Sequence, residues 1–204
     1  AEREVIMIDT VIFDIGNVLV DFCWEEYVHG FGYPEVIEEA VRFAVFQSGV
    51  WPEYDKGILT NEEIVNRMIQ KAPKCEREIR EVNKDFKGCI KAFSYAENWI
   101  RTLNNQGIHT YYLSNYGEKM RKDTEEELKV ISYCEGGVFS YEVKETKPDK
   151  LIYRTLVDKY NLIPENCVFI DDVEENVKTA QAIGMHGIVF RGYKTVCREL
   201  AELI

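Results

Sequence analysis

The sequence predicts an α/β fold: a doubly wound parallel sheet with a small helical unit inserted after its first strand. Short apolar or aromatic runs alternate with amphipathic segments at the start of the chain and through its second half, as in βαβ units. The section from about residue 22 to residue 90 has helical patterns only. We therefore expect a core domain formed by residues 1–21 and 91–204 and a helical domain formed by residues 22–90.

Five runs have the continuous apolar character of parallel strands that are buried on both faces. They are VIFDI at 11–15, IHTYYLS at 108–114, GVFS at 137–140, CVFID at 167–171 and GIVF at 187–190. Between them, KPDKLIYRTLVDKY carries an apolar stripe at helical spacing. EENVKTAQAIG and NWIRTLNNQG close on glycines that suit a helix C-cap.

The inserted section predicts helices in PEVIEEAVRFAVFQS, TNEEIVNRMIQK and REIREVNKDFKGCI. The second of these opens with a capping box from Thr60 to Glu63. We expect WPEYDKG, residues 51–57, to form an irregular loop. A helical unit that directly follows the first strand is well placed to cover the edge of the sheet where that strand ends.

Composition and charge limit the classes of partner. The chain has 204 residues and a formal net charge of −11, and it contains no long run of Lys and Arg. Such a chain repels nucleic acid and anionic membranes, so we expect a small-molecule partner and leave monomer or homodimer open. Six scattered cysteines without a C-x-x-C pair, and an acidic N-terminus without the layout of a signal peptide, indicate a reduced, cytoplasmic protein.

Four stretches outside the helical section carry groups that could do chemistry. They are Asp14 in FDIGN, Ser114 and Asn115 in YYLSNYG, Lys147 in KETKPD, and Asp171 and Asp172 in VFIDDVEEN. Three of these stretches follow an expected strand directly, and the carboxyl ends of parallel strands share one edge where ligands bind. Each residue alone also suits a turn, a helix cap or a solvated surface, so it is the combination that indicates a site.

Together these groups suit a phosphate ester and a divalent cation. Two close carboxylates, Asp14 and Asp172, disfavour joint ionisation unless a cation lies between them, and hard oxygen ligands favour Mg²⁺. Lys147 adds a positive charge for the phosphate, and Ser114 and Asn115 can bond its oxygens. A carboxylate oxygen of Asp14 could then attack phosphorus and form an aspartyl-phosphate.

In FDIGNVLVD, LSN, TKPD and IDDVEEN, the chain resembles the haloacid dehalogenase (HAD) superfamily of phosphatases over its whole length. It is similar to small sugar-phosphate phosphatases, such as α-D-glucose-1-phosphate phosphatase, and to the phosphatase domain of soluble epoxide hydrolase. The resemblance implies a Rossmann-like core and a small helical cap, residues 22–90, which gates the site. Aromatic residues of this cap would stack on a sugar or pack together; they are Trp24, Tyr27, Tyr33, Trp51 and Tyr54.

The resemblance also implies which groups hold the metal ion. Asp14 would be both the nucleophile and a metal ligand, and the backbone carbonyl of Gly16 would be a second protein ligand. Asp172 would bind Mg²⁺ directly, and Asp171 would help through water.

The remaining motif residues would contact the phosphate. Ser114 and Asn115 would bind its oxygens, and Lys147 would steady both the phosphate and the nucleophile. Asn176 is either a substrate-binding residue of the same pocket or an ordinary helix residue.

Gly16 departs from the family pattern. Most phosphatases of this family have an aspartate two residues after the nucleophile, which protonates the leaving group and then activates water. Glycine keeps the backbone carbonyl but not this acid/base, which is typically worth about 10²–10⁴-fold in rate. A substrate with a good leaving group would tolerate the loss, or another residue could supply the proton; the candidates are Asp21, His29, Glu53 and Asp55.

Three functions therefore remain. The sequence favours a Mg²⁺-dependent phosphomonoesterase that acts on small cytosolic phosphates, with sugar phosphates preferred. A hydrolytic dehalogenase needs no proton donor, but the Asp171–Asp172 pair would then have no purpose. A phosphate-binding regulatory protein without turnover would have no need of a nucleophile, yet Asp14 and Lys147 are both present.

Overall fold

The central sheet has five parallel strands in the order β5-β4-β1-β6-β7. The computed structural model describes residues 8–204. The strands are β1 (Thr10–Phe13), β4 (His109–Ser114), β5 (Gly136–Phe139), β6 (Cys167–Asp171) and β7 (His186–Val189). Each corresponds to one of the predicted apolar runs, and the predicted α/β fold is confirmed.

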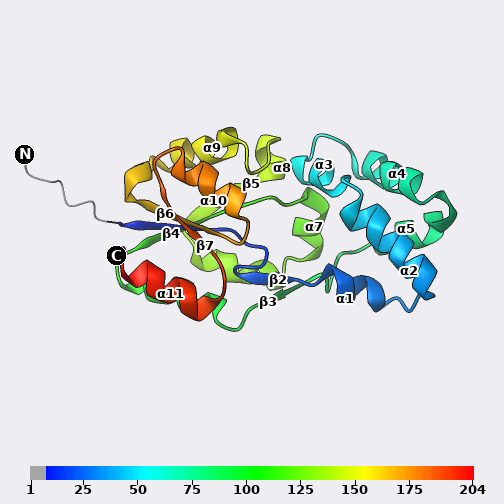
Figure 1. The fold of residues 1–204 in the computed structure, drawn as a ribbon, viewed down its shortest axis with the longest axis horizontal. Helices are drawn as coiled ribbons and strands as arrows, with labels where there is room; N and C mark the ends of the chain where they lie inside the picture. Colours follow the sequence, from blue (N-terminus) through cyan, green and yellow to red (C-terminus); the bar gives the residue numbers. More distant parts are fainter. Residues whose placement is uncertain (1–7) are drawn as a thin grey trace, which may run out of the picture.

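Helices cover both faces of this sheet (Figure 1). Alternate residues of a strand point to opposite faces, so β1 serves two hydrophobic clusters. Phe13 packs with Trp99 of helix α6 (Ala96–Asn105), with ring centroids 4.8 Å apart. Its neighbour Ile12 belongs to the second cluster, with Tyr153 and Leu156 of helix α9 (Lys150–Tyr160). Helix α11 (Tyr193–Ala201) contributes to the first cluster and helix α10 (Glu174–Gln181) to the second.

A second, helical part of the chain lies beside the carboxyl ends of the strands (Figure 1). It contains α1 (Trp24–His29), α2 (Glu35–Arg42), the π-helix η1 (Phe43–Gln47), α3 (Trp51–Lys56), α4 (Asn61–Lys71), the 3₁₀-helix η2 (Pro73–Cys75) and α5 (Glu76–Val82). The predicted capping box is confirmed, because the Thr60 hydroxyl accepts from the Glu63 N–H and the Glu63 carboxylate accepts from the Thr60 N–H.

The prediction of an irregular loop at residues 51–57 was wrong, because this segment contains helix α3. The physical reason is present in the sequence. Pro52 occupies the first turn, where proline suits a helix, and Gly57 ends it in a left-handed conformation with φ of 63°. Six residues are too few for the apolar periodicity on which the prediction relied.

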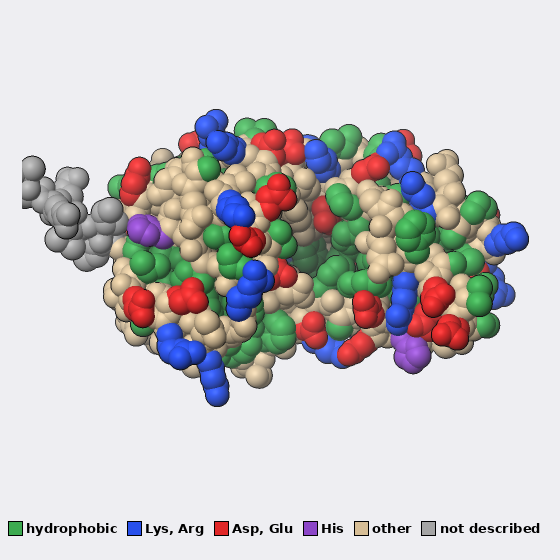
Figure 2. All heavy atoms as spheres, in the orientation of Figure 1, with side chains coloured by type: hydrophobic (Ala, Val, Ile, Leu, Met, Phe, Trp, Pro, Cys, Tyr) green, Lys and Arg blue, Asp and Glu red, His purple; other side chains and the backbone are tan. Residues whose placement is uncertain are grey.

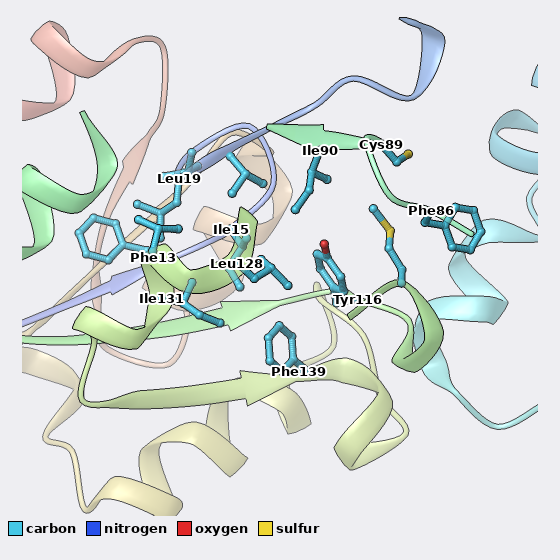
Figure 3. Close-up of a cluster of buried hydrophobic side chains, with 14 of the residues drawn as sticks. Phe13, Ile15, Leu19, Phe86, Cys89, Ile90, Tyr116, Leu128, Ile131 and Phe139 are labelled. Atoms are coloured by element: carbon cyan, nitrogen blue, oxygen red, sulfur yellow. The ribbon is translucent and has the colours of Figure 1, made fainter. Parts of the chain in front are cut away.

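A two-stranded antiparallel ribbon joins the two parts, and the sequence did not predict it. Strand β2 (Val20–Phe22) pairs with β3 (Ile90–Ala92), so the chain leaves the core and returns to it along the same ribbon. Strands of three residues are too short to show the alternation of apolar and polar residues by which a strand is predicted from sequence. The first hydrophobic cluster continues across this junction, from Phe13 and Ile131 on the core side to Cys89 and Phe86 (Figure 3).

The remaining helical segments are α7 (Glu118–Asp123), η3 (Glu127–Tyr133), α8 (Ser140–Val143) and η4 (Pro164–Asn166). Helices α7 and α8 follow β4 and β5, and they approach the helical part from the core side (Figure 1). Within the part of the chain that the structure describes, no helix combines the length and the apolar character that crossing a bilayer requires.

Candidate active site

The predicted site residues converge at the carboxyl edge of the sheet. Strand β1 lies between β4 and β6, so Asp14, which directly follows β1, lies beside Ser114 and Asp171, the last residues of β4 and β6. Beside them lies a cavity of about 240 Å³ between the core and the helical part. Figure 2 shows the surface hollowed at the junction of the two parts, with hydrophobic side chains gathered there. The sequence-predicted residues that line the cavity are Asp14, Gly16, Ser114, Asn115, Lys147, Asp172 and Asn176.

Lys147 holds two of the carboxylates together. Its Nζ lies 2.9 Å from Oδ1 of Asp14 and 2.6 Å from Oδ2 of Asp171, and all three side chains are buried. Burial alone would lower the pKa of Lys147, but the charges of Asp14 and Asp171 outweigh it and raise the pKa above its usual value. Lys147 is therefore a fixed positive charge in the lining of the cavity.

The two oxygens of Asp14 have different environments. Oδ1 accepts a hydrogen bond from the Ile15 N–H at 2.7 Å and pairs with Lys147. Oδ2 has no hydrogen-bond or ion-pair partner within residues 8–204. Burial raises the pKa of this carboxyl and so does the charge of Asp171, whereas Lys147 opposes the rise. Oδ2 is thus an oriented carboxylate oxygen that is free to bind a cation or to attack an electrophile.

Asp171 is fully buried, and both of its carboxylate oxygens accept hydrogen bonds inside the protein. Its carboxylate accepts from the Val173 N–H at 2.8 Å and from Asn176 Nδ2 at 3.1 and 3.0 Å, besides the contact with Lys147. The side chain of Asn176 is therefore directed at Asp171, although the residue also lines the cavity. In this arrangement Asp171 and Asn176 position Lys147; their expected contacts with metal and substrate stay predictions.

Asn115 has a similar supporting arrangement. Its Oδ1 accepts from the Lys147 N–H at 2.8 Å, and its Nδ2 donates to the Lys147 carbonyl at 3.0 Å. The amide thus fixes the backbone of Lys147, which sequence spacing could not indicate. The hydroxyl of Ser114, by contrast, has no hydrogen-bond partner within the described chain, and the residue lines the cavity. It remains available to an oxygen of a ligand.

Three carboxylates form a group that suits a cation. Ligand atoms of Asp14, Asp171 and Asp172 all lie within 4.8 Å of one another. Burial raises the pKa of Asp172, and the charge of Asp171 adds to the rise. One lysine is too little positive charge for three clustered carboxylates, and carboxylate and carbonyl oxygens are the donors that Mg²⁺ prefers. The donor set therefore fits a hard divalent cation.

Asn17 is hydrogen-bonded to one of these carboxylates, that of Asp172, and the sequence did not predict this contact. Its Nδ2 donates to Oδ2 of Asp172 at 3.0 Å, and its Oδ1 accepts from the Phe22 N–H at 3.3 Å. The backbone of Asn17 is left-handed, with φ of 58°, a conformation that asparagine tolerates better than most residues. The sequence Gly16-Asn17 did indicate a turn, but it did not show that the turn links the ends of β1 and β6.

The helical part contributes Trp51 and Asp55 of α3 to the cavity lining. The hydroxyl of Tyr54 instead accepts from the Met120 N–H at 2.7 Å, and a Cβ at Gly117 would lie only 2.1 Å from the Tyr54 ring. The other aromatic residues expected over the site pack within the helical part. Trp24 stacks on Phe46, Tyr27 donates to the Val82 carbonyl, and Tyr33 donates to Glu81.

The four candidates for the missing acid lie in very different places. The side chain of His29 is 77 % exposed and pairs with Glu38, and Glu53 pairs with Arg67 at the surface. Asp21 stands on β2 between Val20 and Phe22, which line the cavity, so its own side chain points the other way. Asp55 alone among the four lines the cavity, and it is only 7 % exposed.

Known proteins share both the sequence pattern and this architecture. A family model for haloacid dehalogenase-like hydrolases matches residues 8–184. Flavin mononucleotide hydrolase 1 of Arabidopsis thaliana is 27 % identical over 158 residues, which are 76 % of this chain and 62 % of that protein. D-ribitol-5-phosphate phosphatase of Bacteroides thetaiotaomicron is 24 % identical over 188 residues, which are 87 % of this chain and 89 % of that protein.

A solved structure shows the same fold. It is that of a HAD family enzyme from Bacteroides thetaiotaomicron in complex with magnesium and inorganic phosphate, and it matches with a TM-score of 0.69 and 22 % identity. The match covers 93 % of this chain and 98 % of that one. Since the family model also spans most of the sequence, this chain belongs to the haloacid dehalogenase-like hydrolases.

Proposed function

We propose that the protein is a Mg²⁺-dependent phosphomonoesterase that hydrolyses small phosphorylated metabolites through an aspartyl-phosphate on Asp14. One observation carries this proposal. Oδ2 of Asp14 is unpartnered within residues 8–204, and Asp14 lines the cavity together with Lys147, whose ammonium group pairs with Oδ1. A buried carboxylate beside a fixed positive charge is suited to attack an anionic electrophile, because the charge offsets the repulsion between the two anions.

Asp14, the backbone carbonyl of Gly16 and Asp172 would hold the magnesium ion, with Asp171 assisting through water. Asn17 keeps Asp172 turned towards β1 by its hydrogen bond. When bound, the ion supplies positive charge that stabilises the phosphoryl group in the transition state. The cluster of three carboxylates within 4.8 Å supports this assignment.

Each residue of the site would have a separate role in phosphoryl transfer. Asp14 Oδ2 attacks phosphorus while the ester oxygen departs on the opposite side. Lys147 neutralises charge on the nucleophile and on a phosphoryl oxygen, and Ser114 donates to another of these oxygens. Asp171 and Asn115 keep Lys147 in place through the contacts described above. Water then attacks the aspartyl-phosphate and releases inorganic phosphate.

We further propose that the helical part acts as a cap, residues 22–90, and that sugar phosphates are the preferred substrates. The cavity of about 240 Å³ leaves room for a small metabolite, and Trp51 offers an aromatic surface for a sugar ring. D-ribitol-5-phosphate phosphatase, a relative that aligns over most of the chain, is named for the phosphate of a sugar alcohol, which is a small phosphorylated metabolite. Opening of the cap would admit substrate, and closure would shield the phosphoenzyme from bulk water.

Hydrolysis of para-nitrophenyl phosphate, with Mg²⁺ or with EDTA, tests the proposed function. We expect turnover that needs the metal ion and competitive inhibition by inorganic phosphate. Halide release from 2-chloropropionate that EDTA does not affect would instead identify a dehalogenase. Binding of inorganic phosphate without turnover of any ester would identify a binding protein. A screen of phosphorylated sugars then defines the substrate.

A further inference from the structure

The proposed reaction needs a proton at the leaving group, and Gly16 does not supply it. Packing does not explain why glycine stands there, because a Cβ at this position would meet no atom within 4 Å. An alkoxide is a poor leaving group, so hydrolysis of a sugar phosphate requires a general acid within reach of the ester oxygen. If the proposed function holds, another residue that lines the cavity must take this role.

Asp55 has the location of such an acid. It lies on α3, it is 7 % exposed, and it lines the cavity together with Asp14 and Lys147. Its carboxyl group makes no hydrogen bond and no ion pair within residues 8–204. The residue is mostly removed from bulk water, but its carboxyl oxygens are not among the fully buried atoms without a partner, so the carboxyl opens onto the cavity and is available to a ligand there.

Contacts with the core fix the C-terminal end of α3, and with it Asp55. Ser140 Oγ donates to the backbone carbonyl of Asp55 at 2.5 Å. One step further on, Lys56 pairs with Glu145 at 3.0 Å, and Lys144 Nζ donates to the Gly57 carbonyl at 2.7 Å. These bonds cross from the core to the helical part. Asp55 is therefore held at the cavity by the core itself, as an acid/base must be if its geometry is to be reproducible.

We propose that Asp55 is the general acid and base of the phosphatase reaction. In the first step, Asp14 Oδ2 forms a bond to phosphorus, the bond from phosphorus to the ester oxygen breaks, and the carboxylic acid of Asp55 gives its proton to that oxygen. In the second step, the carboxylate of Asp55 takes a proton from water as the water oxygen attacks phosphorus. The bond from phosphorus to Asp14 then breaks, inorganic phosphate leaves, and Asp55 is again protonated.

The electrostatics of the cavity favour the protonated form that the first step needs. Burial raises the pKa of Asp55 to about 8, the charge of Asp14 contributes to the rise, and Lys147 opposes it. An arriving phosphate adds negative charge and favours the neutral acid further. A group that is protonated before the first step and ionised after it is matched to both halves of the reaction.

The test compares two esters in the Asp55→Asn variant, which keeps the size of the side chain. Phenyl phosphate has a poor leaving group, so its kcat/KM should fall about 10²–10⁴-fold. Para-nitrophenyl phosphate has a good leaving group and should still phosphorylate Asp14 at a nearly unchanged rate. Because the second step also loses its base, this ester should give a burst of nitrophenolate, with the phosphoenzyme visible by mass spectrometry.

Glu53→Gln is the matched control, since Glu53 lies on the same helix but outside the cavity, and it should alter neither ester. Asp55→Glu keeps a carboxyl and should restore part of the rate on phenyl phosphate. Equal losses on both esters, without a burst, would overturn the assignment of Asp55 if inorganic phosphate still inhibits the variant as it does the wild type. A wild-type protein that hydrolyses neither ester would overturn the proposed function, and this inference with it.

Discussion

The core and the helical part meet at one cavity, but they contribute to it in different ways. On the core side, the backbone brings the groups together, because Asp14, Ser114 and Asp171 lie at the carboxyl ends of neighbouring parallel strands. Hydrogen bonds then fix their orientation, as Asn115 and Asp171 do for Lys147. In the proposed function, this side supplies the groups that act on the phosphoryl group, and every ester needs them.

On the helical side, a single short helix contributes Trp51 and Asp55. Its position depends on contacts with the core, such as those of Ser140 and Lys144, rather than on strand order. With the roles proposed above, attack on phosphorus depends on the core, whereas departure of the ester oxygen depends on α3. Substitutions on the core side should therefore affect all substrates, and substitutions in α3 should affect them according to the leaving group.

The largest effect is expected for Asp14→Asn. An amide is a very poor nucleophile, so turnover of every phosphate ester should fall by about 10⁴-fold or more, as when other enzymes lose their nucleophile. Steady-state rates with para-nitrophenyl phosphate measure this loss, and circular dichroism checks that the fold is retained. Substantial remaining activity would refute Asp14 as the nucleophile and remove the chemistry assigned to the core side.

The core and the short elements next to it also differ in how well the sequence predicts their structure. All five strands of the main sheet were predicted, because each is a run of buried apolar residues bounded by turns. The ribbon of β2 and β3 and the helix α3 were not predicted. These elements have three to six residues, so their conformation depends on contacts such as that of Tyr54 with the Met120 N–H, which no local pattern reveals.

In the candidate site, too, some residues could be predicted from the sequence and others could not. The acids at the ends of the strands, and Lys147 between two helices, could be named from the sequence, because their chemistry and their combination restrict them strongly. The supporting role of Asn115 and the bridge from Asn17 to Asp172 could not, since both depend on side-chain orientation. Asp55 was one of four candidates, and only tertiary burial separates it from Glu53 two residues earlier.

A smaller effect is expected when the missing acid is returned to the core side. Gly16→Asp places a carboxyl where a Cβ meets no atom within 4 Å and where the backbone is not left-handed. In an Asp55→Asn background, this change should recover about tenfold to a hundredfold of the rate on phenyl phosphate, a part of what a general acid supplies. The measurement is the ratio of kcat/KM for phenyl and para-nitrophenyl phosphate.

Gly16→Asn in the same background is the control, because it adds the same volume without an acid. It should leave the ratio of the two rates unchanged. If the aspartate and asparagine variants behave alike, a carboxyl at position 16 does not reach the ester oxygen. In that case only α3, and not position 16 of the core, could place an acid at the ester oxygen.

The smallest effect concerns stability, and it arises because Asp55 is buried without a partner. Its pKa is about 8 in the folded protein against 3.8 for an unburied aspartate, and burial is the main cause. Between these pH values the unfolded chain has lost the proton that the folded chain keeps, so the free energy of unfolding falls as the pH rises, by at most about 1.4 kcal/mol for each pH unit. Asp55→Asn removes this dependence.

The metal-free variant should therefore unfold at a higher temperature than the wild type near pH 8, and the gap should narrow towards about pH 5. A difference of about 1 kcal/mol corresponds to roughly 2–4 °C in a protein of this size. Differential scanning calorimetry in EDTA at several pH values measures it, with Glu53→Gln as a variant whose offset should stay constant. If the difference in unfolding temperature between the variant and the wild type does not grow with pH, the carboxyl of Asp55 is solvated or paired in the folded protein. Asp55 would then not destabilise the fold, and its stability effect would give no support to a catalytic role.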